Sequence, residues 1–398
     1  MESCNTESSL DLPLESLSLQ PFLQSLHKEQ WQEVRLGEVA EIFDYQRIPL
    51  STMQRINRKG AYPYYGASGV IDYIDDFIFD GEFVLISEDG ENLRTRKTPI
   101  AFKVSGKFWV NNHAHIVKGK KDYFNDLIVY LFENLDLNPY ITGAVQPKLN
   151  QSTLLNIPFK IPILETTQQK IAEILSSFDD KIDLLHRQNK TLESLVLTLF
   201  RHYSTHKELD SIIGDIIALQ SGYAFKSKDF QNFGKDRILK IKNIQNSVID
   251  IINTDFVNEN ISKILDSKFR IFGGDILFGM TGAEIGKMGI VPKNNETLWL
   301  NQRVGVLREK FKGAKYLAYL HLTSAFGFDY IVNAASGSAQ PNISAKDIEN
   351  CPFYYFTESE LHNMSLQISP FFEKMIQNSG TILTLQAMRD MLLKAIFA

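Results

Sequence analysis

The feature of this sequence that most constrains its fold is an internal repeat. Residues 143–150 (GAVQPKLN) return as residues 337–344 (GSAQPNIS). Further matches keep the same order along the chain: FWVN at 108–111 with LWLN at 298–301, GEFVL at 81–85 with GDILF at 274–278, and LGEV at 36–39 with IGDI at 213–216. Order is kept while the offsets drift, as loop insertions between two related halves would produce. We therefore expect two similar domains in one chain.

Each half has the same expected order of elements, with short strands first and one long helix last. β-Branched and aromatic runs between Gly, Asn and Asp predict strands at 82–86, 108–117, 238–244 and 298–307. Shorter helices are expected at 123–135 and 314–325, followed by proline-marked strands at 157–162 and 351–356. Each half would then end in a long helix.

The two long helices carry the clearest periodicity in the chain. The first has an alternating three- and four-residue seam made of Leu175, Phe178, Ile182, Leu185, Asn189, Leu192, Val196 and Leu199. The second repeats it through Ile368, Phe371, Met375, Asn378, Ile382, Leu385, Arg389, Leu392 and Ile396. Such a seam indicates pairing with another helix, and a polar Asn within it selects register. The alternative is that each helix packs only on its own domain.

The expected helix ends rest on capping signals. Thr166 with Gln169, and Thr357 with Glu360, both fit the capping box that opens a helix. Pro370 is expected in a first turn or at a kink, because a proline inside a helix removes a hydrogen bond.

These patterns predict an α+β chain with two similar, strand-rich domains separated by two long antiparallel helices. The expected parts are an acidic N-terminal arm (1–30), a first domain (31–164), a central long helix (165–205), a second domain (206–357) and a C-terminal long helix (358–398). The arm is apolar between its acids. It is either a partly disordered arm or a segment that folds back on the second long helix or on a partner subunit, and the packing or partner-facing role is favoured.

The charge balance becomes informative once it is divided along the chain. The chain has 47 acidic and 42 basic residues, but residues 1–30 alone hold five acids and one base. The remainder is therefore near neutral, with 42 acids and 41 bases, and residues 92–121 hold eight bases and no acid. Local basic stretches suit a protein that touches phosphate on one face. Scattered, solvated lysines would give the same count.

Composition also bounds the class of protein. A hydrophobic content of 44% excludes a highly charged disordered chain. Two cysteines, Cys4 and Cys351, cannot build a disulfide framework, and no apolar run is long enough for a membrane span. The acidic N-terminus is unlike a signal peptide. We therefore expect a cytoplasmic protein without a membrane partner.

A search for catalytic motifs predicts neither a catalytic residue nor a metal site. Residues 137–140 (LNPY) lack the second proline of the amino-methyltransferase motif, and residues 282–288 (GAEIGKM) are too short for a phosphate-binding loop. His113 and His115 could bind a metal from one strand, but no carboxylate partner is evident and the second half does not repeat them. Structural or nucleic-acid-contacting histidines are the favoured interpretation.

Several stretches together resemble the specificity subunits of type I restriction–modification systems. The matching stretches are residues 274–287 (GDILFGMTGAEIGK), residues 337–344, and the entry to the first long helix at 157–182. With the repeat, the resemblance covers residues 31–398. The first half departs from it, because Ser87-Glu-Asp-Gly stands where the second half has Thr281-Gly-Ala.

The resemblance implies two target recognition domains that read an asymmetric, bipartite site in double-stranded DNA. Methyltransferase subunits, two of them, would dock on the helices and use S-adenosylmethionine to methylate an adenine flipped from the duplex. Restriction and translocase subunits would use ATP and Mg²⁺. The chain itself would catalyse nothing and bind none of these cofactors. Residues 171–200 as a helix would span ~45 Å, or about 13 base pairs between half-site centres.

The candidate DNA contacts are basic and amide side chains near the repeated loops. In the first half they are Arg55, Arg58, Lys59, Arg94, Arg96, Lys97, Gln146 and Lys148. In the second half they are Tyr223, Lys226, Lys228, Lys242, Thr281, Lys287, Gln340 and Asn342. The repeated Gln-Pro loops have an equally weighted alternative, which is to brace each domain against its long helix. Two other functions stay open: a coiled-coil scaffold that does not read DNA, and a stand-alone enzyme acting on nucleic acid.

Overall fold

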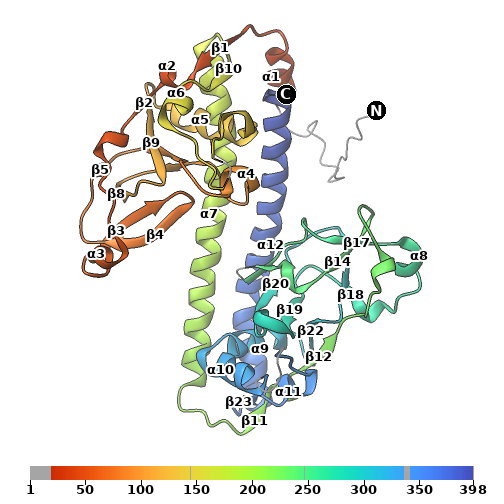
Figure 1. Cartoon of the computed structure of the whole chain (residues 1–398). Coiled ribbons are helices and arrows are strands. Elements are labelled where there is room, and N and C mark those ends of the chain that lie inside the picture. The colour runs from red at the N-terminus through yellow and green to blue at the C-terminus, as the bar shows by residue number, and fades with distance from the viewer. Residues whose placement is uncertain (1–18, 144, 246, 336–340, 398) are drawn as a thin grey trace. The chain divides into compact units, whose positions relative to one another are not determined.

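The computed structural model (Figure 1) describes residues 19–143, 145–245, 247–335 and 341–397. The chain divides into two compact units, one formed by the residues up to Lys181 together with those from Leu385 onward, the other by Ile182–Thr384. The two long helices, α7 (Glu165–Ser204) and α12 (Glu358–Phe397), each contribute to both units.

The first unit contains two four-stranded sheets, ordered β2-β9-β6-β7 and β4-β3-β8-β5. Their strands are β2 (Ala40–Ile42), β3 (Lys59–Gly66), β4 (Gly69–Ile74), β5 (Phe79–Asp80), β6 (Phe83–Ser87), β7 (Ala101–Val104), β8 (Lys107–Val110) and β9 (Ala114–Gly119). The helix α5 (Tyr123–Asn134) packs on β6, β7 and β9 and buries Leu127, Ile128 and Phe132 completely. Short helical segments complete the unit: α2 (Leu36–Val39), η2 (Asp44–Gln46), α3 (Thr52–Ile56), α4 (Asn92–Thr95) and α6 (Gln151–Leu155).

The N-terminal part of this unit packs beside the long helices. The strand β1 (Trp31–Arg35) pairs antiparallel with β10 (Pro158–Pro162), which leads into α7. Before it, α1 (Gln20–Leu26) buries Phe22, Leu23 and Leu26 in the same apolar cluster as Leu392, Leu393 and Ile396 of α12. The described end of the expected arm therefore folds back on the second long helix. Residues 1–18 lie outside the described residues.

The second unit has a six-stranded sheet, β12-β22-β19-β20-β16-β15, and a five-stranded sheet, β13-β17-β14-β21-β18. Its strands are β12 (Ile217–Ser221), β13 (Phe230–Gln231), β14 (Asp236–Leu239), β15 (Ile244–Gln245), β16 (Ser247–Ile249), β17 (Asp255–Val257), β18 (Arg270–Ile271), β19 (Ile276–Gly279), β20 (Met288–Ile290), β21 (Thr297–Leu300) and β22 (Val304–Glu309). A further pair joins β11 (Ser211–Ile212) to β23 (Pro352–Phe353). Its shorter helices are α8 (Glu259–Ser262), α9 (Ala314–Leu322), α10 (Ala325–Ala334) and α11 (Ala345–Glu349).

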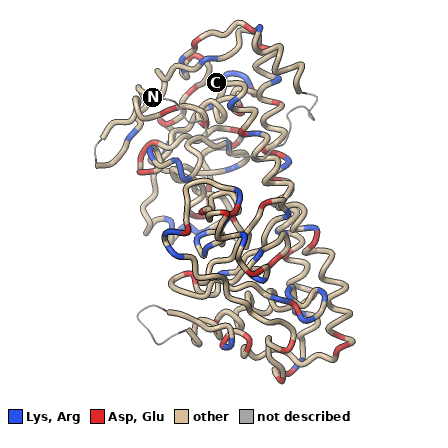
Figure 2. Tube along the Cα trace, turned by 90° about the vertical axis from the view of Figure 1, so that its right-hand side faces the viewer, with Lys and Arg blue, Asp and Glu red and all other residues tan. Residues whose placement is uncertain are grey.

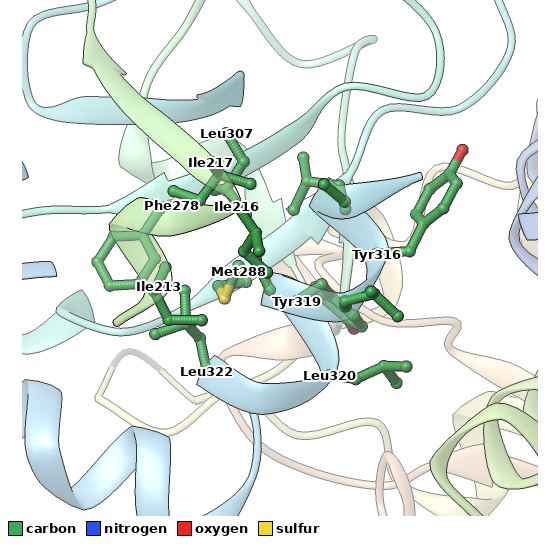
Figure 3. Packing of buried hydrophobic residues seen from close by; sticks show 14 of the residues in the cluster. Ile213, Ile216, Ile217, Phe278, Met288, Leu307, Tyr316, Tyr319, Leu320 and Leu322 are labelled. Atoms are coloured by element: carbon green, nitrogen blue, oxygen red, sulfur yellow. The ribbon is translucent and has the colours of Figure 1, made fainter. Parts of the chain in front are cut away.

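The core of the second unit lies between its six-stranded sheet and α9 (Figure 3). Ile217, Phe278 and Leu307 from the sheet belong to the same buried cluster as Leu320 and Leu322 from the helix. Burial of such side chains contributes roughly 1.5–3 kcal/mol each, so this contact anchors the helix to the sheet.

The repeated FWVN and LWLN segments occupy the same place in the two units. Tyr64 of β3 pairs in parallel with Trp109 of β8, and Ile238 of β14 pairs in parallel with Trp299 of β21. The chain reverses after each of these strands, so the single strands expected at 108–117 and 298–307 were wrong. The cause is a turn at Asn111, whose side chain accepts a hydrogen bond from the His113 amide at 2.8 Å.

The strand expected at 238–244 is also interrupted. It is divided into β14 and β15 by the short helical turn Ile241–Asn243. The Asn243 side chain closes this turn by accepting a hydrogen bond from the Lys240 amide at 2.9 Å.

The seams of α7 and α12 face each other. In the second unit, Asn378 Nδ2 donates to Asn189 Oδ1 at 2.9 Å, and Asn189 Nδ2 donates to Ser379 Oγ at 3.3 Å. In the first unit, Arg389 of α12 contacts Asp179 of α7 at 2.6 Å. The buried seam residues include Leu175, Phe178, Ile182, Leu185, Val196, Met375, Ile382 and Leu392, with Leu192, Leu199 and Leu385 half-buried. The two asparagines therefore satisfy each other across the interface.

The expected capping box is present at the N-terminus of one long helix and not at that of the other. At α12 the expected capping box is present, because the Thr357 amide donates to Glu360 Oε2 at 2.8 Å. At α7 the expected cap at Thr166 was wrong, because the helix already begins at Glu165 and the Thr167 amide donates to the Leu164 carbonyl.

Pro370 lies inside α12, so the expectation of a first turn was also wrong, while the alternative of a kink stays a prediction. Pro370 has no amide hydrogen to donate to the Leu366 carbonyl. Both residues are on the exposed face of the helix. Water can hydrate that carbonyl, while buried Met364, Ile368 and Phe372 hold the opposite face in place.

Candidate nucleic-acid interface

Strand ends and the repeated Gln-Pro loop meet in the first unit. The Gly90 amide, just after β6, donates to the Pro147 carbonyl at 3.0 Å. The Leu149 amide returns a hydrogen bond to the Glu88 carbonyl at 2.8 Å. The loop at 142–149 is therefore held against the end of β6 by its own backbone.

The second unit repeats this arrangement bond for bond. The Gly282 amide, just after β19, donates to the Pro341 carbonyl at 2.9 Å. The Ile343 amide donates to the Met280 carbonyl at 3.1 Å. The backbones of both Gln-Pro loops are thus held against the ends of β6 and β19, whereas the alternative role of bracing each domain against its long helix stays a prediction.

This pairing of the Gln-Pro loop with a strand end puts candidate residues of the two halves at equivalent positions. The backbones of Asp89 and Lys148 form an isolated antiparallel β-bridge in the first unit, as those of Thr281 and Asn342 do in the second. The Ser-Glu-Asp-Gly stretch of the first half therefore occupies the position of the Thr-Gly-Ala stretch, although the residues differ. Gln146 and Lys148 are exposed on this loop, whereas Gln340 lies outside the described residues.

A third loop completes each group. The Glu88 amide donates to the His113 carbonyl at 2.9 Å, and the Met280 amide donates to the Arg303 carbonyl at 3.1 Å. We call residues 87–90, 111–113, 142–143 and 145–149 the first loop cluster. Residues 280–282, 301–303 and 341–343 form the second loop cluster.

A buried ionic network supports the first loop cluster. Arg47 Nη1 donates to Glu88 Oε2 at 2.6 Å, and Arg47 Nη2 lies 3.2 Å from Asp44 Oδ2. His115 Nδ1 shares a hydrogen bond with Asp44 Oδ2 at 2.5 Å, and its Nε2 donates to the Leu149 carbonyl at 2.8 Å. Both ring nitrogens of His115 are therefore engaged, and the residue ties the network to the Gln-Pro loop.

The charges of this network compensate one another. Burial alone would raise the pKa of Glu88, but hydrogen bonds from Arg47 and Lys148 and the proximity of His115 hold that pKa below its ordinary value. Glu88 is therefore ionised at neutral pH and anchors Lys148, whose Nζ lies 3.1 Å from Glu88 Oε1.

The network also corrects the expectation that His115 has no carboxylate partner. Ligand atoms of Asp44, Glu88 and His115 lie within 4.8 Å of one another, as in a site that could hold a metal ion. Arg47, however, contacts both carboxylates and supplies the positive charge there. This donor set is thus already neutralised by a side chain, and we assign it no metal.

The second loop cluster has a neutral support at the corresponding place. Ser221 Oγ donates to the Met280 sulfur at 3.6 Å, below the end of β19. Ser221 and Met280 occupy the positions that Asp44 and Glu88 occupy in the first unit. The same backbone geometry is therefore supported by different chemistry.

Most basic candidates of the first half bind acids or carbonyls of their own domain. Arg55 and Lys59 contact Asp72 at 3.3 and 2.5 Å, and Arg58 contacts Asp75 at 2.9 Å. These three lie on the β3–β4 side, away from the hydrogen bonds that define the first loop cluster. Their role as DNA contacts stays a prediction.

The candidates around α4 differ from one another. Arg96 has a left-handed backbone (φ +49°), and its guanidinium donates to the carbonyls of Phe132, Glu133 and Leu135 at the end of α5. Arg94 donates to the Gly143 carbonyl at 2.9 Å and so reaches the Gln-Pro loop. Lys97 is exposed and makes no hydrogen bond or ion pair among the described residues. Of the three, Lys97 is the most available to a ligand.

The basic candidates of the second half divide in the same way. Lys242 contacts Asp255 at 3.2 Å, and Lys287 contacts Glu284. The Lys226 and Lys228 side chains are exposed and without a partner in the described part of the chain. Figure 2 shows acidic and basic residues interspersed along the chain. Counting basic residues therefore does not locate an interface.

Tyr223 is the aromatic candidate of the second half. Its ring contacts Phe225 and Phe269, and its carbonyl accepts a hydrogen bond from the Gln302 amide at 2.9 Å. Tyr223 therefore lies beside the second loop cluster. His113 was considered in the sequence as a structural or nucleic-acid-contacting histidine. Arg303 was not among the candidate DNA contacts, although the alignment of Asn111 with Asn301 places it opposite His113.

The comparisons with known proteins identify the class. The family described as the type I restriction modification DNA specificity domain matches residues 28–194 and again residues 210–383. The chain therefore belongs to this family, and the duplication expected from the sequence is confirmed.

Individual relatives agree with this assignment. A Haemophilus influenzae protein named as a type I restriction enzyme specificity subunit is 38% identical over 142 residues, or 36% of each chain. The MjaIX specificity subunit of Methanocaldococcus jannaschii is 27% identical over 336 residues, or 76% of each chain. The crystal structure of a type I restriction–modification S subunit from M. genitalium matches with a TM-score of 0.62 at 15% identity, over 93% of this chain and 96% of that one. It confirms the fold class.

Within the residues that the structure describes, none of the helices combines the length and apolar composition needed to cross a membrane.

Proposed function

We propose that this chain is the sequence-reading subunit of a type I restriction–modification complex. It would bind double-stranded DNA at an asymmetric, bipartite site, with one half-site read by each target recognition domain. The observation that carries this proposal is the pair of loop clusters. The same backbone hydrogen bonds recur in both, while the exposed side chains on them differ. A constant scaffold with varied side chains suits two domains that read different sequences.

The chemistry would be supplied by partners. Methyltransferase subunits, two of them in our proposal, would dock on α7 and α12 and methylate a flipped adenine with S-adenosylmethionine. Restriction and translocase subunits would use ATP and Mg²⁺. The chain would bind none of these cofactors and would work in the cytoplasm, beside the DNA.

Footprinting of the assembled complex tests the proposal. The full chain, purified with its methyltransferase subunits, is bound to DNA fragments that it selects, and protection from hydroxyl radicals is mapped. Two protected patches with an open spacer between them are expected. One short continuous patch, or binding without sequence preference, would contradict the proposal; the latter would favour a scaffold.

A further inference from the structure

One position in the loop clusters has a constant backbone and a varied side chain. The His113 amide donates to Asn111 Oδ1 at 2.8 Å, and the Arg303 amide donates to Asn301 Oδ1 at 3.4 Å. The carbonyl of each residue accepts a hydrogen bond from the end of the neighbouring strand, at 2.9 Å for His113 and 3.1 Å for Arg303. Both polar backbone groups are thus engaged, so the position is fixed while the side chain stays free to differ.

The Arg303 guanidinium differs from the other arginines of the two domains. It is exposed and makes no hydrogen bond, ion pair or ring contact with any residue that the structure describes. The other arginines of these domains each have such a partner: Arg35, Arg47, Arg55, Arg58, Arg94, Arg96, Arg237, Arg270 and Arg308. Arg303 therefore has an anchored backbone and a charge that the domain's own packing does not use.

His113 is its counterpart in the first loop cluster. Its side chain is 48% exposed, and Nδ1 lies 2.9 Å from both carboxylate oxygens of Asp89. The carboxylate orients the ring and leaves Nε2 without a partner among the described residues. Thr281, which corresponds to Asp89, makes no such contact with Arg303. The first domain thus holds this side chain in one orientation, whereas the second leaves it free.

We propose that His113 and Arg303 are specificity-determining residues, each reading one base in the half-site of its own domain. This inference rests on the proposed function. Guanine presents two acceptors, N7 and O6, on its major-groove edge, and a guanidinium can donate to both at once. Arg303 therefore selects guanine. Because His113 Nδ1 faces the Asp89 carboxylate, Nε2 is the ring nitrogen left for a base; as an acceptor it selects the exocyclic amino group of adenine or cytosine.

The alternative role for Arg303 is a phosphate contact, which carries no sequence information. The variant Arg303→Lys separates the two roles, because lysine keeps the positive charge but loses the planar pair of donors. A phosphate contact would largely survive this substitution, whereas selection of guanine would not.

Selection from a DNA library provides the test. The full chain, assembled with its methyltransferase subunits, is incubated with duplexes of random sequence, and the retained duplexes are sequenced. For Arg303→Lys and Arg303→Ala we expect the preference for guanine at one position of one half-site to fall roughly 10- to 100-fold. The other half-site should be unchanged, which also shows that the variant complex has assembled.

The first domain is tested in the same library. His113→Ala should relax one position of the opposite half-site and leave the guanine assigned to Arg303 intact. Arg270→Ala is the matched control, because it removes an exposed arginine of the second domain that stacks on Phe272. It should leave both half-sites unchanged.

The outcomes separate the inference from the function on which it rests. If the Arg303 variants bind more weakly but select the same two half-sites, Arg303 is a phosphate contact and the inference is wrong, while the proposed function stands. If the unsubstituted complex selects no bipartite sequence, the proposed function itself fails.

Discussion

The two loop clusters of this chain share their backbone geometry and differ in what lies beneath it. Under the first, Asp44, Arg47, Glu88 and His115 form a buried ionic network. Under the second, Ser221 and Met280 make a single weak contact. Charged groups are therefore not required to place these loops. The two domains therefore depend on different side chains for their stability, and substitutions at equivalent positions should destabilise them unequally.

The largest expected effect comes from removing the cation of the first network. Arg47→Met leaves Asp44 and Glu88 buried without their main partner, which should cost about 3–5 kcal/mol in the stability of the first unit. Native-state hydrogen exchange at the Leu149 amide, compared with Ile343 in the second unit, measures this loss. Ser221→Ala is the control and should cost less than about 1 kcal/mol. Equal effects of the two substitutions would remove the distinction between the clusters.

The stability of the second unit should depend on pH through a buried histidine, His321. Burial lowers the pKa of His321 from 6.5 to about 4, although a hydrogen bond to the Pro352 carbonyl partly opposes this. Between these values the unfolded chain binds more protons than the folded one, so stability is fully present above pH 6.5 and falls as pH falls towards 4. The loss should be about 3 kcal/mol.

Urea unfolding of the second unit between pH 7 and pH 4.5 measures this dependence. His321→Leu removes the titrating group and should flatten the curve. An unchanged slope in that variant would assign the acid sensitivity to other groups.

Smaller effects are expected at the glycines that follow the central strands. Gly90 has φ +104° and Gly282 φ +73°, and a Cβ would meet no atom within 4 Å at either position. Alanine should therefore cost only the backbone strain, about 1–2 kcal/mol. Gly90→Ala should cost more, since its φ is farther from the left-handed minimum. Thermal unfolding of both variants tests the order, and Gly282→Asn should lose less than Gly282→Ala.

The smallest expected effect is a loss of stability of the first loop cluster at acidic pH. The lowered pKa of Glu88 means that its ionised form contributes stability above its ordinary value of 4.5, and the contribution is lost as pH falls through the lower folded value. The protection factor of the Leu149 amide, which is the exchange rate corrected for its intrinsic pH dependence, should fall from pH 5 to pH 3 in the natural chain. In Glu88→Gln the fall should be smaller; an identical profile would exclude Glu88 as the responsible group.

Local periodicity explains what could be predicted from the sequence. The seams of the long helices and the capping box at Thr357 depend on residues close together in sequence, and the duplication depends on stretches that recur in the same order. Each is confirmed. Pro370 was misjudged because the exposure of one helix face is a tertiary property. The turns at Asn111 and Asn243 were missed because β-branched and aromatic residues continue on both sides of them.

The candidate interface was less predictable because charge partners are long-range. Arg55 and Arg96 looked available in the sequence, but Asp72 and the end of α5 engage them. His115 meets Asp44 from 71 residues away. Arg303 was not selected among the seven basic residues between 287 and 315, because only its fixed backbone and the lack of a partner among the described residues distinguish it from them.

Genome-wide mapping of N6-methyladenine, in cells with and without this chain, tests the central claim most directly. If each domain reads its own half-site, the methylated adenines should lie in one asymmetric, bipartite motif with an unspecified spacer. That motif should disappear when the chain is deleted and return when it is restored. Methylation that is unchanged by the deletion, or that falls in a single continuous motif, would contradict the account.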